Sequence, residues 1–277
     1  MTAPIAFPWE TPPPEGTATE VADGVLWMRL PLPMKLDHVN VYAFRDDGDD
    51  GGDDDGDDGG DDYGDDGGGW TNVDTGLDTR RTRAIWQKLL AGPLAGRPVA
   101  RVIVTHHHPD HVGLAGWFQR DHGAELITTR TAWLFARMLL LDEQMVPVDE
   151  TLAYWRSAGM DDAVYEERKA ARPFNYVDIV ADMPLGFRRI KEGSGLRFGA
   201  RDWDVRIGNG HAPEHATLWS RDCDLVIGGD QLLATISPNL GVYATEPEAD
   251  PVGDWLDSCE SLSAFADDRH LVLPGHK

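Results

Sequence analysis

Thr105-His106-His107-His108-Pro109-Asp110-His111 is the stretch that decides how this 277-residue sequence is interpreted. The β-branched run at 101–104 predicts a buried strand directly before it, and 112–123 predicts a helix directly after it. Runs of His also occur in surface metal-scavenging tracts and in tags. A tag is not interrupted by Pro-Asp or enclosed between a hydrophobic strand and an amphipathic helix. We therefore interpret the stretch as a strand-to-helix turn that binds metal.

Four side chains of this turn are candidate metal ligands. His106 and His108 are two residues apart in an extended segment, so their imidazoles project to the same side and can share one ion. Asp110 and His111 lie where the chain turns into the helix and can reach a second ion. Imidazole and carboxylate groups are typical ligands of zinc, and two zinc ions roughly 3.5–4 Å apart form a hydrolytic site. His107 points away from its neighbours and is interpreted as structural or as a support for the ligands.

The pattern His106-x-His108-x-Asp110-His111 resembles the signature of the metallo-β-lactamase superfamily of hydrolases. The resemblance implies a third His for the first metal, a carboxylate that bridges both metals after a hydrophobic strand, and a final His for the second metal. The matching positions, in the expected order, are His211 in 208–213, Asp230 after 225–229, and His276 after 271–275. The first metal would be bound by His106, His108 and His211, and the second by Asp110, His111 and His276, with Asp230 between them.

The resemblance also predicts the fold, an α/β protein with a four-layer αββα metallo-β-lactamase sandwich. We expect a single domain over 1–277, in which the first strands form an antiparallel meander. Alternating and β-branched runs predict strands at 24–29, 38–44, 70–76, 101–104, 124–128, 196–198, 203–208, 216–220 and 225–230. Apolar periodicity predicts helices at 79–94, 112–123 and 254–265.

Two further side chains are expected to support the ligands without binding metal. The family has an Asp after an early strand that supports the metal-binding turn, and Asp74 in Asp74-Thr75-Gly76 resembles it. A plain Asp-Thr-Gly turn is the alternative for that position. His215 is close to His211 in sequence, and we expect it to contact a ligand or to serve the structure rather than to bind metal.

A repetitive acidic segment at 46–69 interrupts the early strands. It belongs to three near-copies of an Asp/Gly octad, and its 13 Asp account for −13 of the formal charge of −23, which leaves −10 for the rest of the chain. With Tyr63 as its only apolar side chain, the segment cannot offset the entropy of ordering, so we expect a disordered loop within a hairpin. A calcium-binding repeat is the alternative, but the nine-residue period and the repeated hydrophobic position of a β-roll are absent.

The segment 131–191 is expected to be a helical cap inserted into the domain. Its helices are predicted at 131–143, 150–157 and 162–171. In the family, insertions between the first metal motif and the third His select the substrate. Aromatic and Met side chains of the cap are expected to wall the site in part, although most of them individually would pack the small core of the cap: Trp133, Met138, Tyr154, Trp155, Tyr165 and Phe174.

The ligand set predicts the chemistry. Two zinc ions bridged by Asp230 would lower the pKa of a shared water toward neutrality, so no Ser or Cys nucleophile is needed. By the resemblance, Asp110 is the catalytic residue that helps a proton to reach the leaving group. We therefore expect a zinc-dependent hydrolase with two Zn²⁺ per chain, or iron as the alternative metal, that cleaves an ester, thioester or lactone of a small, partly apolar molecule.

Ligand details narrow the choice within the family. By the resemblance, true β-lactamases generally lack the bridging carboxylate, so Asp230 favours the branch of glyoxalase II-type thioesterases and lactonases. A mononuclear-iron persulfide dioxygenase shares the first motif and is one alternative, and a degenerate member that binds metal without catalysis is another. The sequence ends one residue after His276, where relatives continue into at least a helix, so the glutathione-contacting part of glyoxalase II is not expected.

The composition of the chain limits the cellular location and the binding partners that we expect for it. No run approaches the ~18–20 apolar residues of a membrane span, and 1–8 does not resemble an export signal. Cys223 and Cys259 have neither zinc-like nor CxxC spacing, which is typical of a reduced, cytoplasmic protein. The acidic charge argues against a nucleic-acid partner. We expect a small-molecule substrate and neither nucleic acid nor membrane as a partner.

Overall fold

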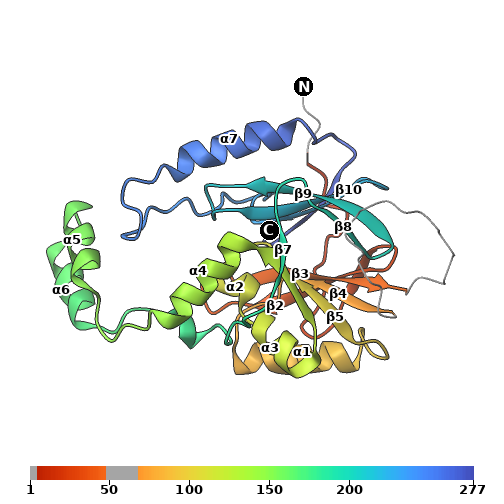
Figure 1. Ribbon diagram of the computed structural model, residues 1–277, viewed down its shortest axis with the longest axis horizontal. Helices are drawn as coiled ribbons and strands as arrows, with labels where there is room; N and C mark the ends of the chain where they lie inside the picture. The colour runs from red at the N-terminus through yellow and green to blue at the C-terminus, as the bar shows by residue number, and fades with distance from the viewer. Residues whose placement is uncertain (1–4, 48–67) are drawn as a thin grey trace.

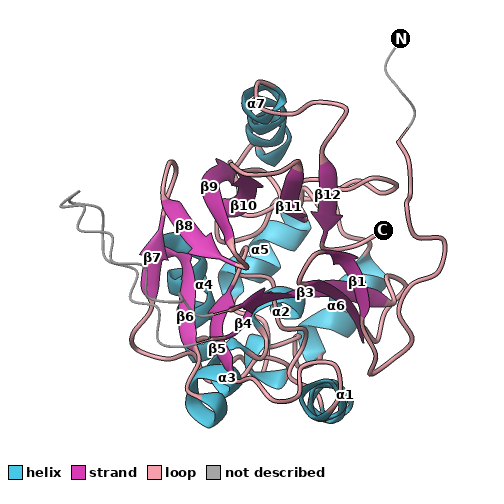
Figure 2. Ribbon diagram, turned by 90° about the vertical axis from the view of Figure 1, so that its right-hand side faces the viewer, coloured by secondary structure: helices cyan, strands magenta, loops and turns pink. Residues whose placement is uncertain are grey.

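The computed structural model describes residues 5–47 and 68–277, and within them two β-sheets face each other with helices on both outer sides. Figures 1 and 2 show α7 (Pro251–Ser263) outside one sheet, and α1 (Arg80–Ala91) and α3 (Ala115–His122) outside the other. The predicted αββα sandwich is therefore confirmed. No helix in this part of the chain is both long and apolar enough to cross a membrane.

The larger sheet contains seven strands in sequence order, antiparallel from β1 to β4 and parallel from β4 to β7. The predicted opening meander is thus β2 to β4, and β1 and β7 were not predicted because each is only three or four residues long. The strands are β1 (Thr19–Ala22), β2 (Val25–Pro31), β3 (His38–Asp46), β4 (Gly69–Val73), β5 (Val99–Ile103), β6 (Glu125–Thr129) and β7 (Arg188–Ile190).

The smaller sheet holds five strands in the order β12-β11-β10-β9-β8. All of its pairs are antiparallel except β11 with β12. A parallel pair needs a crossover connection, and the segment with α7 supplies it. The strands are β8 (Gly195–Phe198), β9 (Arg201–Gly208), β10 (His215–Ser220), β11 (Leu225–Gly229) and β12 (Leu271–Pro274).

Apolar side chains from both sheets form the core between them. Phe44 of β3 meets Phe198 and Trp203 of the smaller sheet edge to face, with ring centroids 5.1 and 5.5 Å apart. A second core fills the space between the larger sheet and its helices, where the buried rings of Trp86 and Phe118 lie 4.9 Å apart. The central strands β3 and β4 are buried on both faces, and this burial fixes the register that places their ends.

The prediction of a single helix at 112–123 is wrong at its N-terminal end, because the chain forms two separate helices in this region. The first is α2 (Pro109–Val112), one turn long, and the second is α3. The break lies at Gly113, where an added Cβ would overlap the carbonyls of Gly76 and Pro109. This close backbone approach bends the chain after the metal-binding turn.

The segment 131–191 forms three helices, but its last residues return to the larger sheet as β7, so the predicted cap ends too late. The helices are α4 (Arg130–Leu141), α5 (Asp149–Ser157) and α6 (Asp162–Ala170), followed by the 3-10 turn η1 (Tyr176–Asp178). Figure 1 shows α5 and α6 side by side, away from the two sheets. Of the aromatics predicted to wall the site, Trp133 stacks on Phe187 and Phe174 is exposed.

Residues 176–183, here called the strap, connect this insertion to the rest of the domain. Ala181 N donates to Gly113 O over 2.8 Å, and Asp78 N donates to Ile179 O over 2.7 Å. Buried side chains of the strap belong to the core on the helix side of the larger sheet. The strap therefore lies across the helices that follow the metal-binding turn.

The first and last residues of the predicted disordered loop at 46–69 belong to strands. Asp46 lies in β3 and Gly69 lies in β4. The Asp46 carboxylate is buried and accepts hydrogen bonds from Thr71 Oγ1 and Gly199 N, both over 2.6 Å. It also pairs with Arg101 Nη2 at 2.8 Å. These contacts close the hairpin at the first residues of the acidic segment, and residues 48–67 lie outside the described residues.

The close approach of the strap gives a test of the fold. Gly116 lies in α3, where a Gly→Ala change ordinarily stabilises a helix. Here an added Cβ would overlap the Asp182 carbonyl, so Gly116→Ala should lower the free energy of unfolding of the metal-free protein by about 1–3 kcal/mol. Gly186→Ala is the control, because its Cβ meets open space. Equal urea midpoints for the two variants would show that the strap does not pack as described.

Candidate metal centre

The candidate ligands converge where strands of both sheets end. His106 follows β5, His211 follows β9, Asp230 follows β11 and His276 follows β12. Each of these strands contributes buried side chains to the core, so the loops that follow them start from fixed positions. The structure brings all seven predicted ligands together in two adjacent groups, His106, His108, His211 and Asp230 in one, and Asp110, His111 and His276 in the other.

The first group has the spacing of a tetrahedral site. His106 Nε2 lies 3.0 Å from His108 Nδ1 and 3.3 Å from His211 Nε2, and His211 Nε2 lies 3.2 Å from Asp230 Oδ2. Ligand atoms about 2.0–2.1 Å from a tetrahedral zinc ion are about 3.3 Å from one another. The donor atoms of this group therefore fit around one zinc-sized ion.

The second group is completed by the same aspartate. His276 Nε2 lies 3.3 Å from Asp110 Oδ2 and 3.2 Å from Asp230 Oδ2. His111 Nε2 lies 3.7 Å from Asp110 Oδ2 and 3.4 Å from Asp230 Oδ1. The carboxylate of Asp230 is thus within reach of both groups, as a bridging ligand has to be.

Two buried polar atoms of the cluster have no hydrogen-bond partner among the described residues, His111 Nε2 and Asp230 Oδ1. Buried polar atoms are ordinarily paired, and a role in binding an ion is one of the explanations for an exception. Imidazole nitrogens and carboxylate oxygens are the donor types that zinc and related divalent ions take. The residues present therefore fit a metal ion in each group.

The charges within the cluster shift its pKa values strongly. Burial, followed by the neighbouring histidines, holds the pKa values of His106 and His108 well below the usual range, so both are neutral. Burial opposes ionisation of Asp230, but the facing histidines hold its pKa well below the ordinary value. For His111, the opposing effect of burial is exceeded by Asp230, Asp110 and Asp74, which raise its pKa. The cluster thus attracts positive charge, which protons or metal ions can supply.

Outer hydrogen bonds orient four of the imidazole rings, one of which is His106, whose Nδ1 lies 3.0 Å from Thr105 Oγ1. In each ring Nδ1 donates to a protein oxygen and Nε2 remains free to face the cluster, which is the arrangement that supports a metal ligand. The other pairs are His111 Nδ1 with Asp74 Oδ2 at 2.8 Å, His211 Nδ1 with Asn239 O at 3.0 Å, and His276 Nδ1 with His38 O at 2.8 Å.

Asp74 contacts the metal-binding turn through hydrogen bonds of its carboxylate, as the family resemblance led us to expect. Its Oδ1 accepts from Thr105 N over 2.9 Å, and its Oδ2 accepts from both Thr105 Oγ1 and His111. The residue is buried and has a φ of 59°, a backbone conformation that Asp and Asn tolerate better than most residues. Its carboxylate therefore links the strand end to the second group of ligands.

Two neighbouring histidines that were not predicted as ligands lie outside both groups. His215 Nε2 accepts from Asp230 N over 3.0 Å, and burial lowers the pKa of His215 to about 3, so this ring is neutral and positions the bridging aspartate. His107 belongs to neither group, and its ring lies 4.8 Å from that of His108 and 4.9 Å from that of Phe135 in α4. Burial lowers the pKa of His107 to about 4.

Sequence reasoning missed the residues that support the ligands from distant segments. The backbone carbonyls of His38 and Asn239 accept from two ligand rings, and Tyr176 of the strap donates from its hydroxyl to His107 O. A backbone carbonyl leaves no signature in the side-chain pattern. For Tyr176 the only available signal was an aromatic residue within an insertion that already held many.

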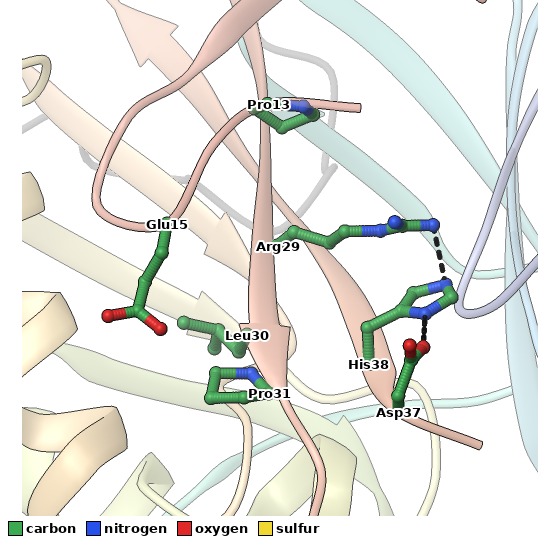
Figure 3. A pocket seen from close by; sticks show the side chains of 7 residues that line it. All are labelled: Pro13, Glu15, Arg29, Leu30, Pro31, Asp37 and His38. Carbon is green, nitrogen blue, oxygen red and sulfur yellow. Dashed lines mark hydrogen bonds and ion pairs between the residues drawn. The ribbon is translucent and has the colours of Figure 1, made fainter. Parts of the chain in front are cut away.

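A cavity of about 180 Å³ is lined in part by His38, the residue whose carbonyl accepts the hydrogen bond from His276. None of the predicted ligands lines this cavity. Figure 3 shows Arg29, His38 and Asp37 along one side of it. Arg29 Nη2 donates to His38 Nε2 over 2.8 Å, and His38 Nδ1 donates to Asp37 Oδ1 over 2.6 Å. This chain of contacts fixes the ring of His38, whose carbonyl receives the His276 hydrogen bond.

The αββα sandwich and its paired His/Asp groups define a metal-dependent hydrolase fold, and sequence comparison agrees with that class. The model of the metallo-beta-lactamase superfamily matches residues 63–276. The chain therefore belongs to the metallo-beta-lactamase superfamily.

Individual relatives lead to the same family. A curated protein of Bacillus subtilis (strain 168), the probable metallo-hydrolase YqjP, is 25% identical over 258 residues, which cover 92% of this chain and 72% of that protein. A beta-lactamase domain protein from Burkholderia ambifaria is 34% identical with a TM-score of 0.81, over 96% of this chain and 71% of that one. The metallo-beta-lactamase family protein TTHA1429 from Thermus thermophilus is 25% identical with a TM-score of 0.67, over 93% of this chain and 75% of that one.

The contacts of Asp74 give a test of the second group. In Asp74→Asn the retained oxygen can still accept from Thr105 N, and the new amide N–H group then faces His111 Nδ1. The histidine would have to carry its proton on Nε2, where it cannot bind metal. Elemental analysis should show about one metal ion lost per chain, with affinity for that ion reduced about 10–100-fold. Full retention of metal at unchanged affinity would contradict the assigned role of Asp74.

Proposed function

We propose that this protein is a di-zinc hydrolase that cleaves an ester, thioester or lactone bond in a small, partly apolar molecule. The observation that carries the proposal is the position of Asp230, whose Oδ2 lies 3.2 Å from both His211 and His276. A single carboxylate shared by two groups of imidazoles suits two adjacent ions. It also favours hydrolysis over the mononuclear-iron persulfide dioxygenase, for which the first group alone would suffice.

The residues of the chain prepare the site for hydrolysis. When bound, the two zinc ions supply an acidified water and a Lewis acid for the substrate carbonyl. Asp230 and His215 fix the spacing of the two groups, and the neutral rings of His106 and His108 present lone pairs rather than protons. The cluster is largely buried, so the interactions of its charges are weakly screened.

Asp110 is the group suited to proton transfer. Its side chain is 18% exposed, compared with 7% for Asp230, so solvent and a substrate can reach it. Burial raises its pKa, but His111 and His276 outweigh that effect and hold the pKa below the ordinary value. Asp110 therefore starts as a carboxylate that can accept the proton of the attacking water and return it to the leaving group.

Apolar and aromatic groups beside the cluster support a partly apolar substrate. Phe135 lies against His107 at the metal-binding turn, and Tyr243 is exposed on the loop whose Asn239 carbonyl holds His211. Tyr154 of α5 donates to Val242 O over 2.9 Å, so the insertion and this loop meet. The two segments together can border a small organic molecule at the metals.

Metal analysis and hydrolysis assays test the function. The protein purified without added metal should contain about two zinc ions per chain. It should hydrolyse simple aryl esters, thioesters or lactones, lose that activity after chelation, and regain it when zinc is restored. One iron per chain without hydrolysis would support the dioxygenase instead, and one zinc without turnover would support a metal-binding protein that lacks catalysis.

Two esters with different leaving groups test the role of Asp110. A carboxylate that returns a proton matters most for a basic leaving group, so Asp110→Asn should reduce kcat about 100-fold or more for an alkyl ester and less for a 4-nitrophenyl ester. Metal content of the variant is measured in parallel, because Asp110 is also a candidate ligand. Equal losses for both esters would assign Asp110 to metal binding alone.

A further inference from the structure

His108 differs from the other candidate ligands in how its ring is held. It faces the first group through Nδ1, the ring nitrogen nearer to the backbone, at 3.0 Å from His106 Nε2. In His111, His211 and His276 the nitrogen that faces away from the cluster is Nδ1, and a hydrogen bond holds it. In His108 the nitrogen that faces away is Nε2, and no hydrogen bond from the described residues holds it. The orientation of this ring therefore depends on its backbone.

That backbone is held by the insertion. The buried hydroxyl of Tyr176 in the strap donates to His107 O, which belongs to the peptide unit that joins His107 to His108. A peptide unit is planar and includes the Cα of His108, so a hydrogen bond that fixes its oxygen also restricts the position of that Cα. Phe135 of α4 holds the same residue from its side chain, with its ring 4.9 Å from that of His107.

We propose that Tyr176 is a positioning residue for the metal centre, through which the helical insertion holds the His107–His108 peptide and thereby the metal-binding nitrogen of His108. This inference rests on the metal centre of the proposed function. Nδ1 is separated from the backbone by only two side-chain torsions, so a rotation of the peptide moves it directly. The insertion is then part of the metal site even though it contributes no ligand.

The local environment suits a permanent donor at this position. Burial raises the pKa of Tyr176, so the hydroxyl keeps its proton and cannot become an acceptor that repels the carbonyl. Two backbone hydrogen bonds fix the strap to the rest of the domain: Ala181 N donates to Gly113 O, and Asp78 N donates to Ile179 O. The donor is thus attached to Gly113, between α2 and α3, and to Asp78, just before α1.

Tyr176→Phe removes only the hydroxyl and tests the proposal. Zinc-loaded variant protein should release one zinc ion to a colorimetric chelator about ten times faster than the wild type. The cobalt-substituted variant should show altered visible absorption bands, because the ligand field at His108 changes. Tyr165→Phe is the matched control, since Tyr165 lies in the same insertion with similar burial and packs on Arg156. It should match the wild type in both measurements.

Equal zinc release and equal cobalt spectra for Tyr176→Phe and the wild type would overturn the proposal. A wild-type protein that retains no metal would instead overturn the proposed function, so the two failures are distinguishable. Urea unfolding of the metal-free proteins shows whether Tyr176→Phe is folded. If it is not, Phe135→Leu, which weakens the other contact of the insertion with His107, is measured in the same way and must also accelerate release.

Discussion

The sharing of one buried carboxylate between two groups of imidazoles is the interaction on which the rest of the site depends. Asp230 is only 5% exposed, and burying such a charge is costly unless nearby positive charge compensates for it. His111, His211 and His276 surround it. Against the effect of burial, the carboxylates raise the pKa values of His111 and His276, so these two rings can compensate as protonated groups, or all three can bind a cation. Binding metal must therefore displace protons, which makes metal affinity in this site dependent on pH.

Ligand geometry of this kind requires support from outside the cluster. A histidine can offer a lone pair from Nε2 only if its proton stays on Nδ1, and here Asp74, Asn239 and His38 accept that proton for three rings. Two of these acceptors are backbone carbonyls, so they are positioned by the fold rather than by residue identity. The sandwich contributes to the chemistry by fixing where strands and loops place their carbonyls.

The sequence was sufficient for the class of fold and for the candidate ligands that the structure brings together. His106, His108, Asp110 and His111 are adjacent in sequence, so local spacing indicated them, and the family order located the rest. Prediction from the sequence failed where contacts with distant backbone segments determine the secondary structure. Gly113 breaks the helix expected at 112–123 because the backbone of Gly76 lies against it, and β7 exists because β6 offers a free edge. Neither cause is visible in local periodicity.

The insertion shows why a variable segment and a fixed metal site need not be independent. Its helices α5 and α6 stand away from the sheets, while its strap and α4 contact the turn that carries four of the ligands. A change in the outer helices can reach His108 through those contacts, and it can reach His211 through the hydrogen bond of Tyr154 to the loop that carries Asn239. Several side chains of the strap are buried, and its backbone is hydrogen-bonded to Gly113 and Asp78, so it limits how far a change in the outer helices can displace the His107–His108 peptide. The outer part of the insertion can then vary in sequence, and adapt to a substrate, without disturbing the position of His108.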